Sequence, residues 1–453
     1  MSNTPEPSRE AKPSHDAEPN HEVDAGREAS PPCSSPPSPS SPPPPSSPQS
    51  SGLPCGMQRR SIDGTMMIDA IAGRTSVFGF GFEPFQEALH RLSRYAIGDS
   101  AERLDDGDGK DRTAGREPDV GEFAFSIDPD LIGMESLCER IRDCFGEGVH
   151  AENILLRPSA DAAVDSAIGL ARRAQSDRGF RTIAVVGSDH GRTGMCRSAS
   201  GRPELQERFG PMMAGFSHVV PGDAEALRAA IYDQTPCLLL CPVSATGPAV
   251  ACEADYLAEV RQICDEHGLL LLIDETQLVV GAAGKALTFA SIAGIRADMV
   301  IVSAGLFGGL PGGLILTSAI DSPTHVNDLG RFPWQAALLS QTLASMQQFG
   351  LPKVTDDSNH PLAVEVAKAL SAFPFVRDIQ ATGLTIGIEI DLEAEPLLGA
   401  AQKSGLRVGT TGENGIRLQP PLVIRDEDQS LLLTRLGSMM ERLERESAEL
   451  ATQ

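Results

Sequence analysis

Five short apolar runs between residues 182 and 317 constrain the fold more than any other feature of this chain. The runs are TIAVVG (182–187), CLLLCPV (237–243), LLLLID (269–274), MVIVS (299–303) and GLILT (313–317). Apolar runs without polar alternation are typical of strands that are buried on both faces. They therefore predict an internal sheet with helices covering both of its faces.

Helical patterns separate these runs. The segment EADYLAEVRQICDEHG, which precedes the third run, places four apolar residues on one face, namely Leu257, Val260, Ile263 and Cys264. Gly268 then fits a C-terminal helix stop. Helical spacing also covers 130–145 and 161–176. Strands that alternate with helices predict an α/β protein with a mostly parallel sheet.

Changes in composition along the chain predict its domains. The predicted parts are a disordered Pro/Ser-rich tail (1–58), an N-terminal segment (59–122) with a polar insertion (99–122), a large domain (123–350) and a smaller α/β C-terminal domain (351–453). The tail segment SPPSPSSPPPPSSPQS has too few apolar residues to form a core. Its P-x-x-P spacing leaves docking to an SH3-like groove as an alternative.

The C-terminal domain differs from the large domain in its pattern of predicted helices and strands. Its predicted elements are a helix (361–372), short strands near 376–381, 384–391 and 416–418, and a charged final helix (427–447). This pattern predicts a small α/β lobe that packs on the large domain.

Charge and cysteine usage narrow the class of protein. The formal net charge is −24, which argues against a nucleic-acid partner because such partners need a basic face. The nine cysteines contain no C-x-x-C pair, which argues against a zinc site or a redox pair. No apolar stretch is long enough to span a membrane, and the N-terminus has no signal core. We therefore expect a cytoplasmic protein.

In open α/β sheets, ligands bind beyond the carboxyl ends of the strands. Asp274 ends the run LLLLID, where a carboxylate after apolar residues is costly unless a partner compensates it. It is either an acceptor for a cationic ligand atom or a capping or loop residue. The segment after Leu156 enters a helix, whose first N–H groups could bind a phosphate. Alternatively, Ser159 or Asp161 simply caps that helix.

Segments spread from residue 62 to 445 resemble one family. They are GTMMIDAIAG (64–73), LRPSADAAVDSAIGLARR (156–173), DHGRTGMCRSASG (189–201), FGPMMAGFSHVVPGDAEALRAAI (209–231), IDETQLVVGAAGKALTFASIAGIRADMVIVSAGLFGGLPGG (273–313), GLTIGIEID (383–391) and GIRLQPPLVI (415–424). Together they resemble the class III pyridoxal-phosphate-dependent aminotransferases of fold type I, most of all the acetylornithine and ornithine aminotransferases. The resemblance implies a fold type I large domain, a small C-terminal domain, pyridoxal 5'-phosphate as cofactor and a homodimer.

The resemblance also implies roles for individual residues. Asp274 matches the partner of the pyridine nitrogen. Other positions that match the cofactor site are Gln277, His190, Ser303 and the loop residues Ser159, Ala160 and Asp161. Arg192 and Arg417 match arginines that hold substrate carboxylates. A small carboxylate or amino acid is therefore the expected ligand.

The sequence departs from the family at its reactive position. The family reads Ser-Ala-Lys or Ser-Lys before its glycines, whereas this chain reads VSAGLFGG, with Ser303 followed by Ala304 and Gly305. The Schiff-base lysine is therefore replaced or deleted, and no catalytic residue is assigned. The six lysines of the chain are Lys12, Lys110, Lys285, Lys353, Lys368 and Lys403. Only Lys285 is nearby in sequence, and it fits a surface turn.

Other cofactor positions depart as well. The phosphate loop has Ala160 and Asp161 where the family has Gly-Thr, which would bring a carboxylate close to a phosphate. Asp189 replaces an aromatic residue that stacks on the cofactor ring, and Cys241 replaces a Glu. Asp328 falls near the position of a threonine from the other subunit. These departures predict a catalytically inactive or impaired homologue. The alternative is an active transaminase whose cofactor binds without a covalent bond or through Lys285.

Overall fold

The computed structural model describes residues 56–61, 63–97, 133–207, 209–319, 329–352, 360–392 and 394–451. The predicted tail up to residue 55, the whole polar insertion 99–122 and Asp328 lie outside the described residues. At the other end of the predicted tail, Met57 is buried and Gln58 begins a strand, so ordered structure includes these positions.

The largest sheet among the described residues has seven strands, in the order β3-β9-β8-β7-β6-β4-β5. Its strands are β3 (Asn153–Arg157), β4 (Thr182–Val185), β5 (Phe216–Val219), β6 (Cys237–Leu240), β7 (Leu270–Glu275), β8 (Met299–Val302) and β9 (Gly313–Thr317). The five strands from β5 to β8 pair in parallel, whereas β9 is antiparallel to both of its neighbours. This mostly parallel α/β sheet confirms the predicted fold class.

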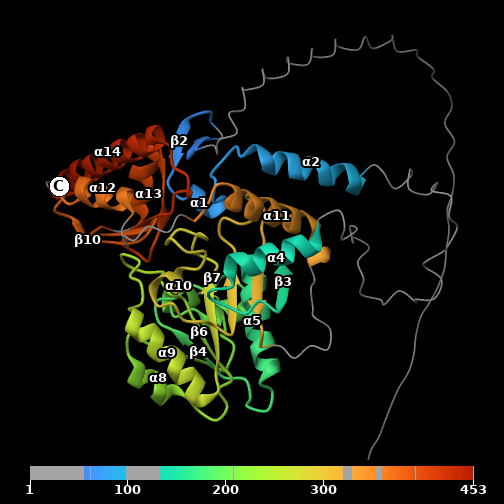
Figure 1. Ribbon diagram of the computed structural model, residues 1–453. Coiled ribbons are helices and arrows are strands. Elements are labelled where there is room, and N and C mark those ends of the chain that lie inside the picture. Colours follow the sequence, from blue (N-terminus) through green and yellow to red (C-terminus); the bar gives the residue numbers. More distant parts are fainter. Residues whose placement is uncertain are drawn as a thin grey trace, which may run out of the picture. The chain divides into compact units, whose positions relative to one another are not determined.

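The side chains of these strands alternate between two apolar layers, as strand geometry requires. Leu239 of β6 and Leu272 of β7 belong to the layer that packs on α5 (Ala160–Ala174). Their neighbours Leu238 and Leu271 belong to the opposite layer, which packs on α9 (Ala254–His267). Figure 1 shows α5 on one side of the sheet and α8 (Ala224–Ala230) with α9 on the other. The strands are thus buried on both faces, as the apolar runs predicted.

Two strands of this sheet were missed by the sequence analysis, and the direction of a third was not predicted. NILLR (β3) and FSHV (β5) contain polar residues, so they lack the signal of a continuous apolar run. β9 is antiparallel because only residues 303–312 connect it to β8, which leaves too little chain for the crossover helix of a parallel pair.

Helices of varied length connect and flank the strands. The other helices are α1 (Ala72–Thr75), α2 (Glu83–Ile97), α4 (Met134–Phe145), α6 (Gly194–Ala199), α7 (Pro203–Gln206), α10 (Thr288–Ile292), η2 (Leu329–Arg331) and α11 (Pro333–Gln348). The buried face of α9 contains the four residues predicted for it, and the helix ends at Gly268. Among the described helices, none is both long and apolar enough to cross a membrane.

A second, four-stranded antiparallel sheet lies in the C-terminal part of the chain, in the order β10-β11-β14-β13. Its strands are β10 (Val376–Thr382), β11 (Thr385–Ile390), β13 (Gly409–Thr410) and β14 (Gly415–Leu418). The helices α12 (Pro361–Leu370), α13 (Ala394–Lys403) and α14 (Asp426–Ala451) pack with it, and α12 and α13 both contact α14. The expected helices and strands of this region are therefore present.

A third sheet joins the two ends of the described chain. β1 (Gln58–Arg60) pairs with β2 (Met66–Asp69), which pairs in parallel with β12 (Leu406–Arg407). Asp428 of α14 is fully buried beneath this sheet. Its carboxylate accepts hydrogen bonds from the Met57 backbone N–H at 3.0 Å and from Gln58 Nε2 at 2.9 Å. The N-terminal strands therefore belong structurally with the C-terminal lobe.

Candidate functional site

The carboxyl end of β7 places Asp274 inside the protein, where its side chain is 1% exposed. One carboxylate oxygen, Oδ2, lies 2.6 Å from His190 Nδ1, and the other accepts a hydrogen bond from the Thr276 N–H at 2.8 Å. Because a carboxylate only accepts, His190 Nδ1 carries the proton of this hydrogen bond. The structure therefore brings two predicted site residues together, and the carboxylate has internal partners.

Glu275, the next residue of β7, points to the opposite face and has a different function. Its two carboxylate oxygens accept hydrogen bonds from the N–H groups of Thr288 and Phe289, both at 2.8 Å, at the start of α10. Burial raises the pKa of Glu275 to about 7, even though these two hydrogen bonds favour the charged form. Glu275 therefore positions α10 and does not face the site of Asp274.

The start of α5 is capped by a side chain of the protein itself. Ser159 is the N-cap residue, and its hydroxyl accepts from the Ala162 N–H at 3.1 Å. This contact confirms the capping alternative for Ser159. Asp161, in the first turn, accepts from the Arg192 N–H at 3.3 Å. Ala160 begins the helix, so a carboxylate now lies where the resemblance expects a phosphate loop.

Gly191 permits this close approach between the loop and the helix. A Cβ at this position would lie 2.5 Å from Asp161 Oδ1, so the carboxylate would have to move, and Gly191 also has φ +124°, which favours glycine. The loop 189–193 is therefore fitted to the carboxylate of Asp161.

Asp189, at the position expected to stack on a cofactor ring, lies within a network of charged groups. Its carboxylate is 3.6 Å from Arg202 Nη1 and 4.0 Å from Arg197 Nη1, and it accepts from the Gly191 N–H at 3.2 Å. The structure thus shows a hydrogen-bonded acid at this position, held by two arginines.

Arg417 projects from β14 and is only 5% exposed. Its Nη2 donates to the Ser244 carbonyl, while its Nε has no hydrogen-bond partner among the described residues. Burial, and then repulsion from Arg74 and Arg202, lower the pKa of Arg417 to about 10. Among the described residues, no carboxylate forms an ion pair with Arg417.

Cys241, at the position where the family has a Glu, provides no negative charge for Arg417. The thiol is buried and donates to the Val243 carbonyl at 3.2 Å. Burial raises the pKa of Cys241 far above its ordinary value, so the thiol stays neutral. It therefore does not compensate the charge of Arg417.

Arg74 is a residue of the site that sequence reasoning missed. It lies in α1, and its Nη2 donates to Gln277 Oε1. Gln277 is in turn connected to the residue that follows β14, because its carbonyl accepts from Gln419 Nε2 at 2.9 Å. A signal was present in the sequence, since an arginine within the small and apolar segment AIAGRTSV has no obvious surface role.

Arg192 and Ser303 differ in accessibility. The side chain of Arg192 is exposed and has no ion pair or hydrogen bond with the other described residues. The Ser303 hydroxyl donates to the Gly312 carbonyl at 2.7 Å and so closes the turn between β8 and β9. Gly305 follows with φ +89°, and its N–H donates to the Arg74 carbonyl at 2.9 Å. The turn therefore holds α1 in place.

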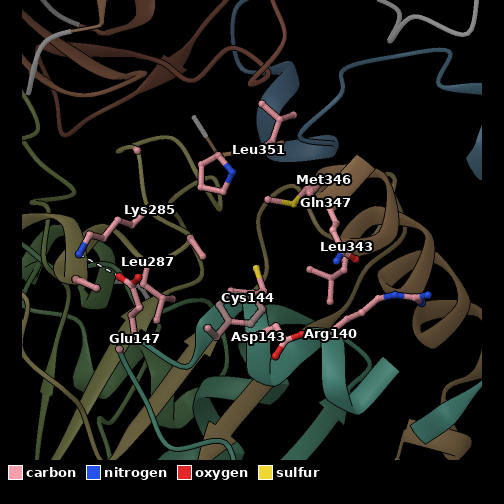
Figure 2. A pocket seen from close by; sticks show the side chains of 16 residues that line it. Arg140, Asp143, Cys144, Glu147, Lys285, Leu287, Leu343, Met346, Gln347 and Leu351 are labelled. Carbon is pink, nitrogen blue, oxygen red and sulfur yellow. Dashed lines mark ion pairs between the residues drawn. The ribbon is translucent and has the colours of Figure 1, made fainter. Parts of the chain in front are cut away.

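Lys285 lies in another part of the molecule. Its Nζ forms an ion pair with Glu147 at 3.0 Å, at a cavity of about 310 Å³ between α4, α11 and the loop before α10 (Figure 2). None of the predicted site residues lines this cavity. The other described lysines are Lys368, which is exposed on α12, and Lys403, which pairs with Glu446. No described lysine contacts Asp274 or His190.

Comparisons with known proteins agree with this architecture. The family described as Aminotransferase class-III matches residues 132–440. The acetylornithine aminotransferase of Brucella melitensis is 33% identical over 307 residues, covering 66% of this chain and 76% of that protein. The acetylornithine aminotransferase of Agrobacterium fabrum is 31% identical over 332 residues, covering 71% of this chain and 82% of the relative.

Solved structures share the fold. The ornithine aminotransferase of Toxoplasma gondii superposes with a TM-score of 0.68 at 20% identity, covering 86% of this chain and 90% of that chain. A transaminase from the marine bacterium Virgibacillus gives a TM-score of 0.69 at 19% identity, covering 87% and 93% of the two chains.

Proposed function

This chain belongs to the class III aminotransferase family, and we propose that it is an acetylornithine/ornithine-type member that no longer performs the cofactor chemistry of the family. The observation that carries the proposal is the segment from Ser303 to Gly305. The resemblance places a Schiff-base lysine here, whereas the chain has Ala304 and then a glycine packed against α1. The protein would then be a binding or regulatory protein on an enzyme fold.

The cofactor of the family is pyridoxal 5'-phosphate, which supplies an electron sink when it is bound. The family's mode of binding uses a covalent lysine, a phosphate cup and a free ring face. Lys285 is a poor substitute for the lysine, because it is paired with Glu147 at a cavity that no predicted site residue lines. This argues against the alternative in which Lys285 holds the cofactor.

The phosphate end of the cofactor fits poorly. Asp161 lies in the first turn of α5, where a phosphate would be bound by the helix N-terminus. At about 4 Å and an effective dielectric constant of about 20, each pair of like unit charges costs about 4 kcal/mol. This repulsion is large compared with the attraction that a helix N-terminus provides, which is about 0.3–2 kcal/mol.

The ring end keeps one residue of the expected set. Asp274 is buried. It could pair with a charged group, but its oxygens already have His190 and Thr276 as partners. At the ring face, Asp189 is held by Arg202 and Arg197 and offers no aromatic surface. The residues present therefore do not fit pyridoxal 5'-phosphate as a whole, and we derive no reaction step through it.

The test is to mix the full-length protein with pyridoxal 5'-phosphate, record its absorbance spectrum, reduce with borohydride and map the peptides. We expect no pyridoxyl-lysine adduct and no transamination of ornithine or N-acetylornithine. An active acetylornithine aminotransferase treated in the same way provides the positive control. An adduct on Lys285, together with turnover that a Lys285→Met variant loses, would show that the alternative is correct.

Two other expectations remain predictions. The resemblance implies a homodimer, which light scattering coupled to gel filtration would measure directly. A cytoplasmic location follows from composition alone, and fractionation of cells that produce the protein would test it.

A further inference from the structure

We propose that a cavity at the carboxyl ends of β4 and β6 binds a small organic cation, namely a diamine with a short apolar chain. The cavity has a volume of about 430 Å³, which lies within the range of small-molecule sites, about 300–1,000 Å³. None of the predicted site residues lines it. This second site therefore goes beyond the proposed loss of cofactor chemistry and does not depend on it.

The cavity lies where the chain leaves two neighbouring strands on opposite faces of the sheet. β4 and β6 pair in parallel. After β4 the chain continues through α6, whose Cys196 and Ala199 belong to the apolar layer of α5. After β6 it continues through α9, whose Leu257 and Val260 belong to the opposite layer. Such a divergence opens a crevice at the carboxyl ends of the two strands, which is where ligands bind in open α/β sheets.

Valines from three segments form the apolar part of the cavity wall. Val186 follows β4, Val243 lies beyond the end of β6, and Val250 lies in the loop 244–252 that leads to α9. Val186 and Val250 are 41% and 49% exposed, whereas Val243 is buried. A ligand with an apolar chain would remove the exposed surface of Val186 and Val250 from water. The wall therefore favours a molecule with a hydrocarbon part.

The charged side chains of the cavity wall are carboxylates. Glu253 precedes the first residue of α9, and Glu389 lies on β11 of the C-terminal sheet. Among the described residues that line the cavity, none is a lysine, an arginine or a histidine. The charge of the wall therefore favours a cation over an anion. Because the two acids lie on different elements, each can bind one amino group of the ligand.

Neither carboxylate forms an ion pair with another described residue. Glu253 is the N-cap residue of α9, but its side chain makes no capping hydrogen bond. Glu389 accepts from the neutral Asn414 Nδ2 at 3.5 Å, which is the long limit of a hydrogen bond. Arg377, on the neighbouring strand β10, forms its ion pair with Asp391 at 2.7 Å. Both carboxylates thus keep acceptor positions for the N–H groups of a ligand.

The loop 244–252 is held in place, so the cavity has a fixed shape. Thr411 Oγ1 donates to the Gly247 carbonyl at 2.6 Å, and the Ala249 N–H donates to the Thr246 carbonyl at 3.3 Å. Ala249 has φ +59°, a conformation that residues other than glycine rarely adopt, so its surroundings must fix it. In a cavity of fixed shape, diamines of different lengths should fit unequally well.

The experiment measures by calorimetry the binding of the diamines from propane-1,3-diamine to hexane-1,6-diamine, and of butylamine and Mg²⁺, to the full-length protein. We expect one chain length to bind best. This diamine should bind about 10-fold more tightly than butylamine, because its second amino group gains one hydrogen bond between charged groups. Glu253→Gln and Glu389→Gln should each lower the affinity for this diamine about 10-fold, to that of butylamine.

Glu139→Gln is the matched control for these two variants. Glu139 is exposed on α4 and does not line the cavity, so its replacement changes the net charge equally. Val250→Lys is a second test. Because Val250 is exposed, the added ammonium group is tolerated by the fold, and its charge should abolish the binding of both kinds of amine. Circular dichroism and the melting temperature of each variant establish that it is folded.

Three results would overturn the site. Affinities that fall equally in Glu139→Gln and in the two cavity variants would show a general charge effect. Diamines that bind no better than butylamine, or not at all, would show that the two carboxylates do not act together. Mg²⁺ that binds as tightly as the best diamine would indicate a metal site. The cofactor test is independent of these results, because a pyridoxyl-lysine adduct would overturn the proposed function and leave diamine binding unchanged.

Discussion

Two cation-bearing regions of this molecule differ in how their positive charges are paired. At the cavity shown in Figure 2, the partly exposed Lys285 forms an ion pair with Glu147. Arg417, by contrast, is buried and donates to the uncharged Ser244 carbonyl. The exposed cation therefore has a charged partner, where the pair contributes little, whereas the buried cation has none, where an unpaired charge is costly.

The largest expected effect concerns the turn that supports Arg74. A Cβ on Gly305 would lie 2.7 Å from Val77 Cγ1 and 2.9 Å from the Gly73 carbonyl oxygen, at φ +89°. Gly305→Ala should therefore lower the free energy of unfolding by about 3–5 kcal/mol, which urea denaturation measures.

Gly64→Ala is the matched control for that variant. Gly64 has φ +88°, but a Cβ there meets no atom within 4 Å. Gly64→Ala should lower the free energy of unfolding only through the strained backbone conformation, by about 1 kcal/mol. Equal losses in both variants would mean that the packing of Gly305 against α1 contributes nothing.

Glu275 is a buried carboxyl group that accepts hydrogen bonds but has no cation beside it. Its pKa is raised from the ordinary 4.5 to about 7, so the folded protein holds this proton more tightly than the unfolded chain does. Its contribution to stability is complete below pH 4.5 and is lost as the pH rises through 7, an effect of up to about 3 kcal/mol. Urea denaturation between pH 4.5 and 8 should show this decline, and Glu275→Gln should lack it. An unchanged pH dependence in the variant would contradict this assignment.

Replacing Arg417 tests the cost of an unpaired charge. Met has a similar volume and no charge, so Arg417→Met should leave stability unchanged or raise it by about 1–3 kcal/mol in the absence of ligand. Urea denaturation of the variant and of the wild type measures this difference. A variant that is strongly destabilised without ligand would show that Arg417 is a structural residue.

The smallest effect is expected at the compensated pair. Lys285 and Glu147 are both solvent-accessible, and exposed ion pairs contribute about 0–1 kcal/mol. Lys285→Met should therefore change the melting temperature by only a few degrees at most, which differential scanning calorimetry measures. A fall in stability as large as the one expected for Gly305→Ala would remove the contrast between the two regions.

Much of the fold could be predicted because burial leaves a strong mark on sequence. The strand β7 was predicted from its apolar run, and one face of α9 from its spacing. β5 was missed because FSHV is a short edge strand that is only partly buried. The pairing of β2 with β12 was also missed, because contacts between residues some 340 positions apart leave no local pattern.

The site was harder to predict than the fold. Asp274 could be found because a carboxylate at the end of an apolar strand is costly without a partner. Its partner, His190, could not be derived from spacing, because 84 residues separate the two in sequence. Arg74 was missed for a similar reason. It belongs to the site only because Gln277 connects α1 to Gln419, the residue that follows β14.

The buried carboxylate of Asp428 sets a limit on how the chain can be shortened. It accepts the backbone N–H of Met57, so a fragment that starts at Gly56 retains this contact. A fragment that starts at Ser61 loses it and exposes the buried carboxylate of α14 to solvent. We expect the first fragment to melt like the full chain and the second to melt several degrees lower. Asp428, near the end of the chain, thus determines where the shortest stable fragment can begin.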